Sequence, residues 1–219
     1  MSCLVKFHNM DLPTIKNGNF PDKYLREGLD KAYDKLHLFS IAKEMNLKLL
    51  SSMCLRKEYS AIFDILENDL KTERVFCHND FRSQNILVSK KDSRLYLCDV
   101  EYSAYGIRPS DLSTFLMEWG VGPLRYRIPD DETIDYVVKM YLEEYDKIEP
   151  GHSEKPENSL KQVSNEIKVS FLRSYLFLIS FMAEKEQSFP DTLPFDYKEN
   201  LVSFLKRKIN LLFCFRIYF

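Results

Sequence analysis

Glycine is scarce in this chain, and no segment of the chain is rich in it. The 219 residues include six glycines, at positions 18, 28, 106, 120, 122 and 151. None of them belongs to a glycine-rich loop next to a strand and a lysine, the arrangement that cradles nucleotide phosphates in several folds. We therefore expect no phosphate-covering loop within this sequence.

An excess of charge of either sign is also missing. Lysine and arginine total 31, aspartate and glutamate total 33, and the formal net charge is -2. Proteins that bind nucleic acid or an anionic membrane surface usually carry a basic bias. The composition therefore predicts neither partner, and it is otherwise that of an ordinary globular domain.

Long hydrophobic runs are absent as well. The apolar run Phe171–Ala183 has 13 residues and includes Arg173, while Ile209–Phe219 is shorter and includes Arg216. Neither is long enough to span a bilayer, and residues 1–10 have no apolar core of the length that a signal peptide needs. The five cysteines are odd in number and form no CxxC pair. Reduced thiols, a cytoplasmic location and no membrane insertion follow as expectations.

Apolar residues recur with mostly helical spacing. The pattern predicts helices over about 23–50, 55–70, 169–185 and 197–209, and a further helix near Ile134 that begins after Pro129. Two short strand-like runs, 86–88 and 94–99, flank a polar turn and predict a β-hairpin. The polar segment 147–168 is expected to be an exposed loop within one domain that covers residues 1–219.

Residues 75–119 contain the motif that bears on chemistry. His78-x-Asp80 is followed by Asn85, and Asp99 comes fourteen residues after the asparagine. One carboxylate that orients an acceptor hydroxyl, with two oxygen ligands for Mg²⁺, is what phosphoryl transfer from ATP requires. A loop and a hairpin with this spacing would bring Asp80, Asn85 and Asp99 into one cleft.

The same stretch resembles the choline/ethanolamine kinases. The resemblance rests on FCHNDFRSQNIL from Phe76, on Asp99-Val100-Glu101-Tyr102, and on Arg108–Asp111 with Glu118-Trp119. Residues 6–13 are similar to the segment that follows the lobe hinge in that family. The resemblance implies an α+β, protein-kinase-like fold, here a large helical C-lobe with a small β-hairpin and without the N-lobe.

The resemblance also implies roles for individual residues. Asp80 is expected to be the catalytic base, and His78 to support the catalytic loop. Asn85 and Asp99 are expected to bind Mg²⁺, with Glu101 bracing the metal site.

The expected pocket for the substrate cation includes Tyr102, Glu118, Trp119 and Tyr175. A quaternary ammonium donates no N–H hydrogen bond, so aromatic faces and carboxylates must hold it. On base rates for buried aromatics, Tyr175 is more often a core residue than a ligand contact, and a lone tryptophan such as Trp119 is close to evenly balanced.

The implied activity is Mg-ATP-dependent phosphorylation of choline or ethanolamine in phospholipid biosynthesis. The sequence leaves the choice between the two amines open. A non-catalytic pseudokinase or fragment is the alternative, one that binds an amine or pairs with a full-length relative. A homodimer is a further expectation from the family. Aminoglycoside phosphotransferases share the His-x-Asp-x4-Asn loop, but the Asp99–Tyr102 and Glu118-Trp119 elements argue against that class.

Overall fold

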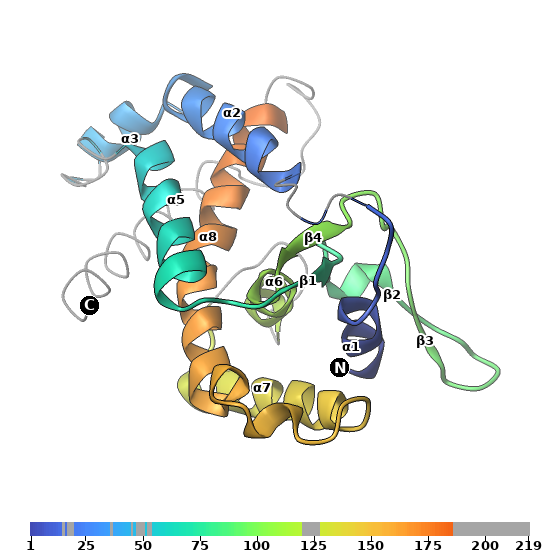
Figure 1. The fold of residues 1–219 in the computed structure, drawn as a ribbon. Helices are drawn as coiled ribbons and strands as arrows, with labels where there is room; N and C mark the ends of the chain where they lie inside the picture. Colours follow the sequence, from blue (N-terminus) through green and yellow to red (C-terminus); the bar gives the residue numbers. More distant parts are fainter. Residues whose placement is uncertain are drawn as a thin grey trace. The chain divides into compact units, whose positions relative to one another are not determined.

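The structure is a computed structural model that describes residues 1–14, 16, 20–35, 37–44, 46, 51, 54–119 and 128–185. The chain divides into two compact units (Figure 1). Unit 1 consists of residues 1–22 and 62–174, and unit 2 of residues 23–61 and 175–219. Each unit is described by itself below. The predicted helix 197–209 and the apolar end of the chain lie outside the described residues.

Two small antiparallel sheets form the β structure of unit 1. Strand β1 (Arg74–Cys77) pairs with β4 (Ala104–Ile107) in a register that places Arg74 opposite Ile107 and Cys77 opposite Ala104. Strand β2 (Ile86–Val88) pairs with β3 (Leu95–Leu97) and forms the hairpin that the sequence predicts. The β1–β4 pairing was not predicted, because its strands are far apart in the sequence and each is only four residues long.

Unit 1 also contains helices and helical turns. They are α1 (Ser2–His8), the end of α5 (Leu55–Asp64) with a π-helix at Ile65–Asp69, a 3-10 turn at Ser83–Asn85, α6 (Pro109–Glu118) and α7 (Asp131–Asp146). Helix α1 contacts β1, β3 and α7. Helix α7 begins where the sequence predicts, because the Asp130 carboxylate accepts a hydrogen bond of 2.9 Å from the backbone N–H of Thr133.

The segment 147–168 is not the exposed loop that the sequence predicts. Two 3-10 turns, His152–Glu154 and Pro156–Asn158, lead directly into α8 (Leu160–Lys185), which therefore begins well before the expected start at residue 169. The prediction was wrong because glycine, proline and charged residues dominate the local composition. The buried side chains that fix this segment are widely spaced: His152, Asn158, Val163, Glu166 and Ile167.

Arg108 holds this segment to the start of α6. Its guanidinium is 1% exposed and donates to both carboxylate oxygens of Glu166, at 2.8 and 2.9 Å. It also donates to the side chains of Glu73 and Asn158, at 3.0 and 2.5 Å. Burial alone would lower the pKa of Arg108, but the bonds and charges of Glu166 outweigh it and the net direction is a raised pKa. A guanidinium with this many charged and polar partners stays charged in the interior.

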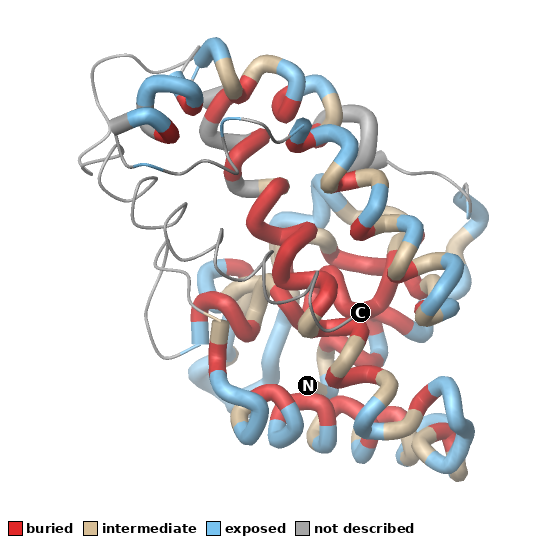
Figure 2. Tube along the Cα trace, turned by 90° about the vertical axis from the view of Figure 1, so that its left-hand side faces the viewer, coloured by how far each residue is buried: buried red, intermediate tan, exposed pale blue. Residues whose placement is uncertain are grey.

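Unit 2 consists of helices in its described part. They are α2 (Phe20–Lys35), α3 (Leu38–Glu44), the first part of α5 (Leu55–Asp64) and the last part of α8. The single helix predicted over 23–50 is interrupted between α2 and α3 at His37, whose φ is 50°, and residues 47–50 lie outside the described part of the chain. Buried and exposed residues alternate along α2 and α5, as expected for helices with one face toward a core, whereas the described side chains in the last part of α8 are almost all buried (Figure 2).

Helices α2 and α8 approach each other closely in unit 2. A Cβ atom added to Gly28 would overlap the Ser180 hydroxyl and would lie 2.8 Å from the Ser180 backbone oxygen. Only glycine fits at this position without a shift of one helix. Within the described part of the chain, no helix combines the length and the apolar character that are needed to cross a membrane.

Candidate active site

The loop between β1 and β2 brings Asp80 and Asn85 into direct contact. The Asn85 amide nitrogen donates to the Asp80 carboxylate at 2.7 Å and to the Asp80 backbone oxygen at 2.9 Å. Asn85 is buried at the end of the 3-10 turn, and Asp80 is half-buried. The hydrogen bonds fix the orientation of the carboxylate. Because its NH₂ group is used on Asp80, Asn85 has its amide oxygen to offer to a cation.

His78 lies inside the loop rather than at its surface. Its side chain is buried, its Nε2 lies 2.9 Å from the backbone oxygen of Cys98, and the Asp80 backbone N–H donates to its Nδ1 at 3.3 Å. The ring thus connects the loop to the strand that precedes Asp99. This arrangement suits the supporting role expected from the sequence, in which the imidazole does not react.

Asp99 follows the β2–β3 hairpin, and the residue before it, Cys98, is hydrogen-bonded to the loop that carries Asn85. The Cys98 N–H donates to the Asn85 backbone oxygen at 3.0 Å. Asp99 has φ of 61°, a left-handed conformation that is uncommon for residues other than glycine, and its side chain is exposed. Carboxylate and amide oxygens are the ligands that Mg²⁺ prefers, so Asp99 and Asn85 suit this metal by their chemistry.

The phenol of Tyr102 is affected by the negatively charged carboxylates near it. Partial burial raises the pKa of its phenol, and the nearby carboxylates of Glu101, Asp80 and Asp99 raise it further. The four residues are therefore close enough for their charges to interact. Glu101 and Tyr102 are both exposed, and the cleft expected from the sequence stays a prediction.

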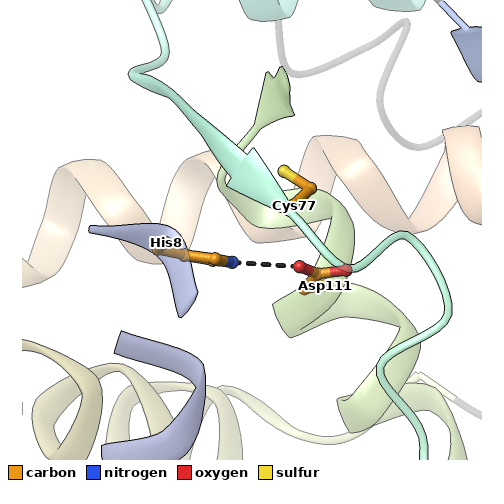
Figure 3. Close-up of side chains that lie close together, drawn as sticks. All are labelled: His8, Cys77 and Asp111. Atoms are coloured by element: carbon orange, nitrogen blue, oxygen red, sulfur yellow. Dashed lines mark hydrogen bonds and ion pairs between the residues drawn. The ribbon is translucent and has the colours of Figure 1, made fainter. Parts of the chain in front are cut away.

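Asp111, on α6, anchors the start of the loop between β1 and β2. Its carboxylate accepts the backbone N–H groups of His78 and Asn79, both at 2.7 Å, and lies 3.0 Å from Nε2 of His8 (Figure 3). An ionised carboxylate only accepts, so the His8 Nε2 carries a proton. The other ring nitrogen of His8 lies 2.8 Å from the hydroxyl of Tyr141 on α7. Three elements thereby fix the first residues of the loop.

Cys77 lies beside His8 and Asp111, and the three ligand atoms are within 4.8 Å of one another. Burial raises the pKa of the Cys77 thiol well above its ordinary value, and the Asp111 charge raises it further. The thiol donates weak hydrogen bonds to the backbone oxygens of Val75 and Ile107. Both oxygens of Asp111 are already hydrogen-bonded. These contacts of the cluster are thus structural hydrogen bonds.

An ion pair joins the loop between β1 and β2 to the end of α6, where Glu118 and Trp119 lie. The Arg82 guanidinium forms an ion pair of 2.7 Å with the nearly buried carboxylate of Glu118 at the end of α6. The neighbouring Trp119 is 39% exposed, and its ring makes an edge contact with Phe115 at a centroid distance of 5.2 Å. The indole is thus partly fixed and partly open to solvent, as a cation-binding aromatic would be.

Tyr175 lies on the part of α8 that belongs to unit 2, and its side chain is buried. The structure thus gives it the burial of a core residue. Its place in a substrate pocket stays a prediction. The sequence did not single out Asp111 or His8 as loop anchors, nor Arg82 as a partner of Glu118. The only feature in the sequence that points to these three residues is that each is a polar residue within one of the segments on which the family resemblance rests.

The fold is similar to that of a solved kinase. An ethanolamine kinase from Plasmodium vivax superimposes with a TM-score of 0.61 at 16% sequence identity, over 94% of this chain and 56% of that chain. The fold is therefore that of a helix-rich kinase with small sheets.

The chain belongs to the choline/ethanolamine kinase family, whose model matches residues 2–205. Among curated relatives, a probable ethanolamine kinase of Arabidopsis thaliana is 27% identical over 64% of this chain and 37% of its own length. A mouse choline/ethanolamine kinase is 31% identical over 53% of this chain and 29% of its own length. Human ethanolamine kinase 1 is 27% identical over 74% of this chain and 37% of its own length. The matched region thus spans about a third of these relatives.

Proposed function

We propose that the chain carries the phosphoryl-transfer site of an enzyme that phosphorylates the hydroxyl group of choline or ethanolamine with Mg-ATP. One observation supports this most strongly. The Asn85 amide is hydrogen-bonded to the Asp80 carboxylate at 2.7 Å, so the two groups that the reaction needs are adjacent and oriented. Membership of the choline/ethanolamine kinase family supplies the substrate class.

In the proposed reaction, Asp80 accepts the proton of the acceptor hydroxyl as its oxygen forms a bond to the γ-phosphorus of ATP. The bond from that phosphorus to the β–γ bridging oxygen breaks, and ADP leaves with the electron pair. Asn85 and Asp99 would hold Mg²⁺, which neutralises triphosphate charge when it is bound. His78 and Asp111 act only by holding the loop in place.

The amine end of the acceptor is assigned to Glu118, Trp119 and Tyr102. Glu118 supplies negative charge, and the two exposed aromatic rings supply faces on which a cation can rest. Family membership and these side-chain types support the assignment. Phosphocholine or phosphoethanolamine would then be released toward phospholipid synthesis.

A coupled assay of ADP release from Mg-ATP tests the proposal, with choline and ethanolamine offered separately. The variant Asp80→Asn keeps the shape of the side chain but cannot accept the proton, so turnover should fall by at least about a hundredfold. Asp69→Asn is the matched control, because Asp69 is an exposed aspartate of the same unit. Turnover equal in Asp80→Asn and the wild type would refute the assignment of the base. A folded wild-type chain without turnover would favour a non-catalytic, amine-binding member of the family.

A further inference from the structure

His8, the last residue of α1, takes no part in the proposed chemistry, yet its side chain is completely buried and uses both ring nitrogens. Its Nε2 lies 3.0 Å from Oδ2 of Asp111, and its Nδ1 lies 2.8 Å from the hydroxyl of Tyr141 (Figure 3 shows the bond to Asp111). An apolar side chain of similar size could fill the same space. The two polar contacts therefore need an explanation beyond packing.

We infer that His8 is a positioning residue for the loop that carries Asp80. The inference rests on the proposed function, because it takes Asp80 to be the base. His8 does not touch the reacting atoms. It acts through Asp111, by holding one oxygen of that carboxylate at the place where the carboxylate binds the backbone of the loop.

The protonation of the His8 ring follows from its two partners. An ionised carboxylate only accepts, so Nε2 donates to Asp111. Burial raises the pKa of Tyr141 well above its ordinary value, so the phenol keeps its proton and can donate to Nδ1. A neutral ring with its proton on Nε2 satisfies both partners at once, since each ring nitrogen takes the role that the bond of the other leaves to it.

Hydrogen bonds lead from Asp111 to the candidate site along two routes. Oδ2 of Asp111 accepts from the His78 N–H at 2.7 Å, and Nδ1 of His78 accepts from the Asp80 N–H at 3.3 Å. Oδ1 accepts from the Asn79 N–H at 2.7 Å, and the Asn79 side chain donates to the backbone oxygen of Tyr102 at 2.9 Å. The first route reaches the expected base, and the second reaches the segment that carries an expected magnesium ligand.

His8 supplies the donor that fixes Oδ2 of Asp111 from outside the loop. The other donor to this oxygen is the His78 N–H, which belongs to the loop itself. Without His8, the carboxylate and the loop could shift together. With it, Asp111 is tied to α1 and, through Tyr141, to α7, and these two helices contact each other. Such a tie matters because a misplacement of about 1 Å can cost about a hundredfold in rate.

Two substitutions of His8 separate its two bonds. The amide nitrogen of glutamine can take the place of Nε2 and donate to Asp111, whereas asparagine ends at the level of Nδ1 and reaches only toward Tyr141. His152→Asn is the matched control. His152 is a second buried histidine of unit 1 that stacks on a tyrosine of α7, but its hydrogen bond, of 2.9 Å, is to Glu149.

Coupled ADP-release kinetics and amide hydrogen exchange, read by mass spectrometry on peptides that cover residues 76–80, test the inference. In His8→Asn, kcat should fall by about tenfold or more while KM for the amine changes by less than about twofold, and the loop amides should exchange about tenfold faster, as expected for the loss of a hydrogen bond to a charged group. His8→Gln should restore kcat and the exchange rates to within about threefold of the wild type. His152→Asn should leave both unchanged.

The outcomes separate the two proposals. If His8→Gln lost as much as His8→Asn, or if neither differed from the wild type, the bond to Asp111 would not position the loop. If the folded wild type had no turnover, the proposed function would fail, and the exchange rates would still decide whether His8 holds the loop. Where neither variant folds, nitrogen NMR of the wild type with isotope-labelled histidine decides. A proton on Nε2 of His8 is required, and a ring protonated on Nδ1 alone would overturn the inference.

Discussion

The Asp111→Asn variant should unfold at a much lower denaturant concentration than the wild type, because one oxygen of the carboxylate becomes an NH₂ group. The change keeps the size of the side chain. It removes the negative charge that three donors now share: the N–H groups of His78 and Asn79 and the Nε2–H of His8. The side chains of Asp111 and His8 are completely buried, so water cannot replace a lost partner.

The magnitude follows from which donors remain paired. The amide oxygen fits best where Oδ2 now accepts from His78 and His8, which leaves the Asn79 N–H facing an NH₂ group. A buried donor without a partner costs about 1–3 kcal/mol, and the remaining bonds weaken because they lose a charged acceptor. The expected loss is about 3–5 kcal/mol of the free energy of unfolding, a large part of the stability of an ordinary domain.

Urea denaturation followed by circular dichroism measures this loss. Asp131→Asn is the control, since Asp131 is an exposed aspartate whose ion pair with Lys168, at 2.9 Å, is open to solvent. That variant should lose less than about 1 kcal/mol. If Asp111→Asn lost no more than Asp131→Asn, the carboxylate would not be the anchor of the loop between β1 and β2.

Two further predictions concern other parts of the chain. Gly28→Ala should destabilise the protein by about 1–3 kcal/mol in the same urea assay, since the new methyl group lies 2.8 Å from the Ser180 backbone oxygen. Ser180→Ala should rescue it only in part, and full tolerance of Gly28→Ala would refute the close approach of α2 and α8. Iodoacetamide at pH 8 should modify the exposed Cys54 but not the buried Cys77, whose raised pKa keeps it a neutral thiol. Mass spectrometry after brief treatment gives the result, and rapid labelling of Cys77 in the folded chain would contradict its burial.

The sequence predicts those parts of the fold that local patterns determine. The hairpin 86–97 was found from alternation, and the helix near Ile134 from its apolar spacing and from the start signal after Pro129, and these signals lie within a few residues. The β1–β4 sheet and the early start of α8 were missed. Both depend on partners that are distant in the sequence, such as the contact between Arg108 and Glu166, which are 58 positions apart. No local propensity encodes a partner of that kind.

The candidate site likewise contains some contacts that local spacing predicts and others that it does not. Asp80 and Asn85 are five residues apart in one loop, so their contact could be expected from spacing. Asp111 binds the same loop from 32 and 33 positions away, and Arg82 meets Glu118 across 36 positions. The local sequence contains no signal for these pairings. The motif therefore predicts which groups are candidates for the chemistry, and the tertiary contacts decide how those groups are held.

The backbone of the site shows why distant anchors are needed. Asn79 and Asp99 have φ of 62° and 61°, and a left-handed conformation costs a residue with a side chain about 1 kcal/mol or more. The bond from the Asn79 N–H to Asp111, and the bond from the Cys98 N–H to the Asn85 oxygen beside Asp99, offset that cost. The two turns are thus held in place by hydrogen bonds that are already present without any ligand. In the proposed phosphoryl transfer, a site fixed in this way would not have to reorganise as charge develops on the transferred group, which is the condition under which oriented polar groups accelerate a reaction most.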